Sequence, residues 1–420
     1  MLRSKAVVLS AIAGILLAFS FPSWNPAWDT SYFAFIALIP LFFACERRDS
    51  YEGCDSYDPQ RGYEPCEESS VGRAPCALFF LGWFAGLICF AVSLSWVTIS
   101  MHQYGGLPWA VSILLMLLLS AYLAIYVGCF TTVIYFSKQN LLVVAPFAWV
   151  ALEYLRGHLL TGFPWNALGY SQYRNLPLIQ IADIASVYGV SALIVFINAA
   201  LFLIIQMAWD KRVLAKAPIF VLVTVLTTTL LYGYYRLSLP MAGGTATASG
   251  EPLRVAVIQG NIDQAVKWTP EARDKTIETY EKLSLPFSHL ADLVVWPEAA
   301  LPVFFQNEPL YQQRLVDLTQ KGSFSLLFGS PAFKGAESGQ ISLLNSAYLL
   351  SPSFLGPPLF QYDKMHLVPF GEYVPLKSLL FFVDKMVTGI GEFVPGQEAK
   401  VMEIPFARRG RSPKIGTVIC

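Results

Sequence analysis

Three segments in the second half of the chain each place a reactive side chain at the end of an apolar run. The segment "DLVVWPEAALP" presents Glu298, "YDKMHLVPFGEYVP" holds Lys364, and "GTVIC" ends in Cys420. A carboxylate, an ammonium and a thiol at strand ends can supply a base, an oxyanion stabiliser and a nucleophile. Together they predict catalysis by an activated cysteine.

Each of the three residues also has an ordinary interpretation. Glu298 fits a solvated loop acid, Lys364 an exposed cation beside Asp363, and Cys420 a buried cysteine that acts as a small hydrophobe. Chance seldom gives three complementary groups at strand ends, but spacing alone does not show that they converge. The β-branched run 415–419 predicts that Cys420 follows a buried strand.

The region after residue 252 alternates short apolar runs with turn residues. Thr269 as N-cap and Pro270 at the first helical position predict a helix between the first two strands. Strand, helix and strand in this order indicate an α/β or layered α+β domain. The expected strands are Leu253–Gln259, Leu293–Trp296, Ser325–Phe328, Ala347–Leu350 and Ile415–Cys420.

The chain as a whole has the composition of a membrane protein, and its long apolar runs lie in the first half. The 420 residues are 55% hydrophobic and only 14% charged, far from the average of soluble proteins. We therefore expect three regions: a helical membrane domain at 1–240, a small-residue linker at 241–252 and a second domain at 253–420. About seven helices are expected, at 6–21, 31–45, 77–100, 109–136, 141–157, 180–208 and 217–237.

The distribution of Lys and Arg predicts the orientation in the membrane. With the N-terminus in the cytoplasm, most Lys and Arg of the short loops fall inside, while Arg174 falls outside. An odd number of spans then puts the second domain on the outer side. Glu153 and Arg156 can pair on one helix face, either as a neutralised pair in an interfacial belt or as part of a lipid-facing entrance.

Several partners are not expected. The formal net charge of zero gives no reason to expect nucleic acid. Seven cysteines without a CxxC pair and four histidines show no metal-ligand spacing, so we expect neither a metal nor another cofactor. The loop 46–76 is interpreted as a solvated loop without evident chemistry.

The motifs resemble those of a known family. "WPE", "YDKMHLVPFGEYVP" and the "VIC" strand look like the Glu, Lys and Cys motifs of the nitrilase superfamily. "EYLRGHLLTGFPWNALGYSQY" and "VIQGNIDQAVKW" look like the apolipoprotein N-acyltransferase family of bacterial membrane enzymes. The resemblance covers nearly the whole chain.

The resemblance implies a nitrilase-like αββα sandwich on the outer face of the inner membrane. It implies Glu298 as general base, Lys364 as oxyanion stabiliser and Cys420 as nucleophile, with Glu372 and the aromatic Trp268 at the substrate. The acyl donor would be a membrane phospholipid, and the acceptor the α-amine of a diacylglyceryl-modified lipoprotein cysteine. A thioester on Cys420 would link the two steps.

The chain departs from this family at one point. Members carry a Tyr-Glu pair, further strands and an eighth helix after the cysteine, so we expect an incomplete sandwich and a fragment of a longer enzyme that is inactive alone. Two alternatives stay open: a membrane-anchored amidase that uses water in the second step, and a non-enzymatic transporter or scaffold with an outer partner-binding domain. Transporters tend to carry mid-membrane ionisable groups and internal repeats, and neither is clear here.

Overall fold

The protein consists of two compact units, Met1–Thr245 and Ala246–Cys420, which are described separately. The structure is a computed structural model. It describes residues 2–22, 29–46, 74–137, 140–209, 216–239, 253–263, 267–335, 341–353, 358, 360–369, 371–373, 393–405 and 413–419. The expected linker 241–252 and the loop 47–73 lie outside the described residues.

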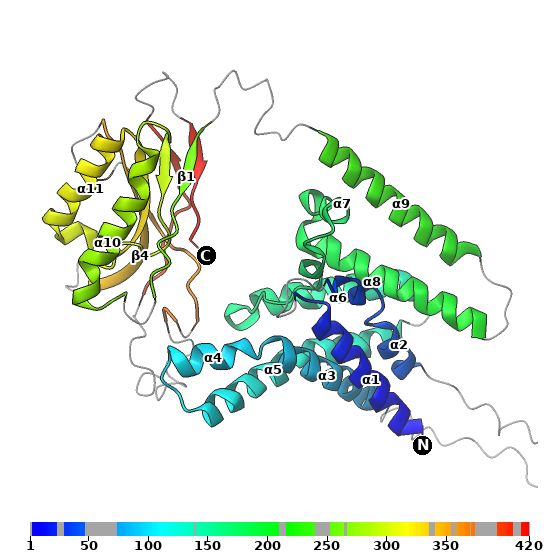
Figure 1. The fold of residues 1–420 in the computed structure, drawn as a ribbon. Coiled ribbons are helices and arrows are strands. Elements are labelled where there is room, and N and C mark those ends of the chain that lie inside the picture. The colour runs from blue at the N-terminus through cyan, green and yellow to red at the C-terminus, as the bar shows by residue number, and fades with distance from the viewer. Residues whose placement is uncertain are drawn as a thin grey trace, which may run out of the picture. The chain divides into compact units, whose positions relative to one another are not determined.

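All regular elements in the described part of the first unit are helices (Figure 1). Its elements are α1 (Leu2–Phe19), η1 (Ser31–Phe35), α2 (Ile39–Cys45), α3 (Ala74–Ser93), α4 (Trp96–Gln103), α5 (Trp109–Phe136), α6 (Leu141–His158), η4 (Leu159–Thr161), η5 (Leu168–Gln172), α7 (Leu176–Ile179), α8 (Ala182–Trp209) and α9 (Lys216–Ser238).

Four of the described helices are long and apolar enough to cross a membrane. They are Pro75–Ser93, Trp109–Phe136, Ala182–Trp209 and Lys216–Ser238, and the predicted membrane bundle is confirmed to this extent. Two predicted segments differ in detail. The segment 31–45 is a 3-10 turn followed by the short α2, and 77–100 breaks after Ser93 into α3 and α4.

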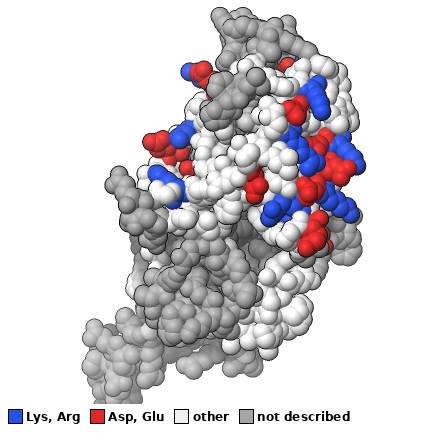
Figure 2. Space-filling model, turned by 90° about the vertical axis from the view of Figure 1, so that its left-hand side faces the viewer, with Lys and Arg blue, Asp and Glu red and all other residues white. Residues whose placement is uncertain are grey.

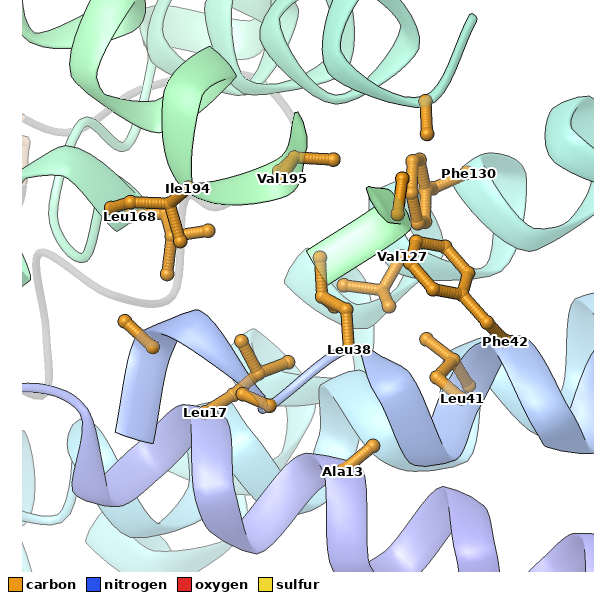
Figure 3. Packing of buried hydrophobic residues seen from close by; sticks show 14 of the residues in the cluster. Ala13, Leu17, Leu38, Leu41, Phe42, Val127, Phe130, Leu168, Ile194 and Val195 are labelled. Atoms are coloured by element: carbon orange, nitrogen blue, oxygen red, sulfur yellow. The ribbon is translucent and has the colours of Figure 1, made fainter. Parts of the chain in front are cut away.

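A buried amide joins two distant parts of this bundle. Asn198 on α8 donates from Nδ2 to the carbonyl of Ala34 at 2.8 Å and accepts the N–H of Leu38 at Oδ1 at 2.9 Å. These backbone groups lie at the turn before α2, where no helix satisfies them, and an unpaired group there would be costly in an apolar interior. Around this turn pack the apolar side chains drawn in Figure 3, among them Leu38 and Ile194.

Glycines allow α3 and α5 to pack closely. A Cβ built on Gly82 would lie 2.3 Å from Thr131 Oγ1 and 2.5 Å from the carbonyl oxygen of Val127. The short distance between the two helices also allows a hydrogen bond, in which the Thr131 hydroxyl on α5 donates to the Leu78 carbonyl on α3 at 2.8 Å. Small residues at membrane-helix contacts give this kind of backbone proximity.

The second unit contains a five-stranded sheet in the order β1-β2-β3-β4-β5. The strands are β1 (Val255–Val257), β2 (Leu293–Val295), β3 (Ser325–Gly335), β4 (Ile341–Leu350) and β5 (Phe360–Asp363). The pairs β1–β2 and β2–β3 are parallel, whereas β3–β4 and β4–β5 are antiparallel. Strand β5 was not predicted, and β4 begins earlier than the predicted Ala347.

Helices cover one face of this sheet and a hairpin covers the other. α10 (Pro270–Ser284) and α11 (Pro309–Gly322) lie side by side on one face (Figure 1). Thr269 accepts the N–H of Ala272, so the predicted cap and helix start are confirmed. On the opposite face, Met402 and Ile404 at the hairpin of β6 (Val401–Glu403) and β7 (Lys414–Gly416) pack against the sheet. In the described residues the layers are helices, sheet and hairpin, which correspond to the first three layers of the predicted, incomplete αββα sandwich.

The outer surface of the two helices is charged with both signs. Figure 2 shows Lys, Arg, Asp and Glu interspersed on this side of the molecule. Arg314 on α11 contacts Glu281 on α10 at 2.7 Å, which links the two helices. The pair is partly buried and uses both oxygens of Glu281, and the mixture of signs around it indicates a solvated face.

The predicted strand at 415–420 is wrong in extent. Strand β7 ends at Gly416, and Val418 is 86% exposed where a buried strand was expected. The reason is the extent of its partner, because Gly416 pairs with Val401, where β6 begins, and no residue of β6 lies opposite Thr417 or Val418. Cys420 lies outside the described residues.

Gly82→Leu should lower the free energy of unfolding by about 1–3 kcal/mol, because the added atoms force α3 and α5 apart. Thermal unfolding in detergent micelles measures this loss. The matched control is Ala110→Leu on α5, where the side chain is exposed. Equal stability of the two variants would contradict the close packing at Gly82.

Candidate active site

The strand directions bring the reactive residues to one edge of the sheet. β4 is antiparallel to both β3 and β5, so β5 runs in the same direction as β1, β2 and β3. The carboxyl ends of these four strands therefore point toward the same edge. Glu298 follows β2 by three residues and Lys364 follows β5 directly.

Gly329 lets the segment after β2 cross over β3. A Cβ built on Gly329 would lie 2.5 Å from the backbone nitrogen of Ala299 and 2.8 Å from the Cα of Glu298. Ala299 adopts the left-handed backbone, with φ of 49°, and Leu301 donates its N–H to the Gly329 carbonyl at 3.0 Å. Glu298 thereby reaches beyond its own strand toward β4 and β5.

The centre of the site is the ammonium of Lys364. Its Nζ lies 3.2 Å from Glu298 Oε1 and 3.0 Å from Glu372 Oε2. The Lys364 side chain is only 2% exposed, against 12% for Glu372 and 41% for Glu298. Removing an ammonium from water costs several kcal/mol, which these two charge-assisted contacts offset. The alternative of an exposed cation at Lys364 is therefore wrong.

Asn345 on β4 joins the two carboxylates and was missed in the sequence. Its Nδ2 donates to Glu298 Oε1 at 2.6 Å and to Glu372 Oε1 at 2.8 Å. Its backbone carbonyl accepts the N–H of Lys364 at 2.8 Å. The signal was an amide in the middle of the apolar strand "ISLLNSAYLL", where burial demands hydrogen-bond partners.

Backbone contacts fix Glu372 in turn. Val368 donates its N–H to Glu372 Oε2 at 2.7 Å, and Phe393 donates its N–H to the Glu372 carbonyl at 3.0 Å. The structure thus brings together Glu298, Lys364 and Glu372, a convergence that the spacing of the motifs did not show. His366, in the same segment, is exposed.

Trp268 is connected to this cluster through Lys267, which contacts both the Trp268 ring and the backbone of Glu298. The Trp268 side chain is 49% exposed, and Lys267 Nζ lies 5.7 Å from the centre of its ring. Lys267 also donates from Nζ to the backbone carbonyl of Glu298 at 3.4 Å. Burial lowers the pKa of Lys267, while the charge of Glu298 acts in the opposite direction.

The other predicted pair, Glu153 and Arg156, serves the packing of the first unit. Both side chains are buried, with Arg156 Nη2 3.8 Å from Glu153 Oε1. Glu153 accepts the N–H of Leu168 at 2.7 Å, and Arg156 donates to the carbonyl of Trp165 at 2.9 Å. The pair therefore holds the segment after α6 against that helix.

Two family models match the chain. The apolipoprotein N-acyltransferase N-terminal domain matches residues 66–200, and the carbon-nitrogen hydrolase domain matches residues 254–420. An apolipoprotein N-acyltransferase of Geobacter metallireducens is 41% identical over 98% of this chain and 72% of its own length. One from Haemophilus influenzae is 34% identical over 71% of this chain and 56% of its own length.

The chain belongs to the apolipoprotein N-acyltransferase family. It spans about half to three quarters of the length of these two relatives. A solved amidase from Nesterenkonia sp. is 18% identical, with 40% of this chain and 55% of that chain covered, and a TM-score of 0.26. A TM-score of this size does not establish a shared fold. The nitrilase-like fold is instead supported by the match of residues 254–420 to the carbon-nitrogen hydrolase domain. Within the described residues, no group of three His, Cys, Asp or Glu side chains could hold a metal ion.

Gly329→Ala should lower the free energy of unfolding of the second unit by about 1–3 kcal/mol and displace Glu298, because backbone atoms occupy the space of the new methyl group. Gly335→Ala on the same strand is the matched control, since nothing lies within 4 Å of its Cβ. Thermal unfolding of both variants checks the difference. A loss as large in Gly335→Ala would show that the crossing at Gly329 is not the cause.

Proposed function

We propose that this protein transfers an acyl chain from a membrane phospholipid to the α-amine of the diacylglyceryl-cysteine of apolipoproteins. The observation that carries the proposal is the cluster of Glu298 and Glu372 around the buried ammonium of Lys364 at the carboxyl edge of the sheet. Membership of the family supports the same activity. The cluster favours an enzyme over a transporter or scaffold, because it combines a part-exposed carboxylate with a desolvated ammonium.

In this proposal Glu298 is the general base, Lys364 the oxyanion stabiliser and Cys420 the nucleophile. Among the described contacts, Lys364 and Asn345 both bind Glu298 Oε1, so Oε2 is the atom assigned to accept the thiol proton. Lys364 Nζ contacts Glu298 Oε1 at 3.2 Å and the two oxygens of Glu372 at 3.2 and 3.0 Å. One of the three N–H donors of the ammonium is assigned to each carboxylate. The third is assigned to the oxyanion.

The first half-reaction would form the acyl-enzyme. Glu298 takes the proton of the Cys420 thiol, and the thiolate attacks the carbonyl carbon of the phospholipid ester. The tetrahedral oxyanion is held by Lys364, a type of contact worth about 3 kcal/mol of barrier. When the ester C–O bond breaks, Glu298 returns the proton to the leaving oxygen, which gives a lysophospholipid and a thioester.

The second half-reaction would transfer the chain to the lipoprotein. The α-amine attacks the thioester carbonyl, Glu298 accepts the proton of the amine, and Glu298 then passes this proton to the released thiolate. An amide bond forms and the thioester bond breaks. Glu372 and Asn345 are assigned the role of holding the base and the ammonium in place, and Trp268 that of contacting substrate.

We also propose the bacterial inner membrane as the location, with the second unit on the periplasmic side. Lipoprotein acceptors and phospholipids are both membrane-bound, so the active site must lie close to a bilayer. The apolar helices of the first unit supply that attachment. The bias of Lys and Arg toward the segments placed inside supports the orientation.

Glu298→Gln should keep fold and membrane insertion but slow acyl-enzyme formation at least a hundredfold, because an amide cannot accept the thiol proton. The measurement is the mass of the hydroxylamine-sensitive thioester that accumulates on the full-length protein with phospholipid alone. Glu271→Gln, at an exposed site on α10, is the control. Undiminished thioester in Glu298→Gln would remove this residue from the role of base.

A topology experiment tests the orientation separately. A protease-cleavage tag inserted in the expected loop 46–76 should be protected from protease added to the periplasmic side of spheroplasts. A tag inserted between residues 336 and 340 of the second unit should be cut. Permeabilised cells, in which both tags are cut, provide the control. The reverse pattern in intact spheroplasts would overturn the proposed orientation.

A further inference from the structure

A second lysine lies beside the proposed base. Lys267 Nζ contacts the backbone carbonyl of Glu298 at 3.4 Å, at the opposite end of the residue from the carboxylate that binds Lys364. The side chain is half-buried, and the ring of Trp268 lies 5.7 Å from its ammonium. A cation held by a carbonyl and an aromatic face has a defined position before substrate arrives.

The charges around the base show why a second cation matters. Glu298 and Glu372 carry two negative charges, and Lys364 supplies one positive charge that is almost fully enclosed. An anionic substrate that approached this cluster would meet an excess of negative charge. Lys267 balances that excess and is more accessible than Lys364. Burial lowers the pKa of Lys267, which shows that its ammonium is already partly desolvated.

We propose that Lys267 is a specificity-determining residue that binds the phosphodiester of the phospholipid acyl donor. The inference rests on the proposed function and adds the recognition of the donor headgroup to it. The contact with the Glu298 carbonyl uses one of the three N–H donors of the ammonium, so others can reach phosphate oxygens. Trp268 would support the cation and contact the glycerol region of the lipid.

The test compares two acyl donors in the first half-reaction of the full-length protein. The donors are phosphatidylethanolamine in mixed detergent micelles and p-nitrophenyl palmitate, which has no phosphate. In Lys267→Met we expect the phospholipid concentration for half-maximal thioester formation to rise roughly tenfold, with the maximal rate nearly unchanged. Acylation by p-nitrophenyl palmitate should match the wild type, and Lys267→Arg should restore most of the phospholipid affinity.

The control variant is Lys275→Met, which removes an exposed lysine of α10 and should change neither donor. Equal losses of rate with both donors in Lys267→Met would overturn the inference, since Lys267 would then act by positioning Glu298. Unchanged affinity for phosphatidylethanolamine would also overturn it. If the folded wild type forms no thioester with either donor, the proposed function itself fails. This outcome concerns the wild type, so it can be told apart from the two Lys267→Met outcomes that overturn the inference alone.

Discussion

A buried ammonium is the constraint from which the rest of the site follows. Lys364 is 2% exposed, and a charge so far from water persists only beside opposite charge. The carboxylates of Glu298 and Glu372 satisfy this need, but they come from separate parts of the chain. The fold therefore has to bring the end of β2 and the segment after β5 to the same place. The sheet direction and the crossing at Gly329 accomplish this.

The sequence predicted the chemistry of the site better than its geometry. Glu298 and Lys364 could be recognised because each follows an apolar run that forms a strand. The role of Gly329 could not be predicted, because a glycine in a strand can mark a close approach of another backbone but does not indicate which segment approaches. Asn345 was equally hidden, since its partners are distant in sequence and only the folded chain shows that it lies between two carboxylates.

The helical unit was predicted from the length of its apolar runs, and its interruptions were missed. Hydropathy responds to composition, so 77–100 looks like one span although a turn separates α3 from α4. The small unpredicted strands β5 and β6 have another cause. At four and three residues they are too short for a periodic pattern, and their pairing partners define them. Tertiary contacts, which no local pattern contains, fix both features.

The choice of an amide at position 345 follows from the same electrostatics. Two carboxylates that share one ammonium repel each other, and a neutral donor between them relieves the repulsion without adding charge. Aspartate there would add a third negative charge, and leucine would leave both acceptors without this donor. Because the Asn345 backbone also receives the N–H of Lys364, one residue fixes the base, the second carboxylate and the ammonium together. The strand β4 thus acts as the rigid support on which the two flanking segments meet.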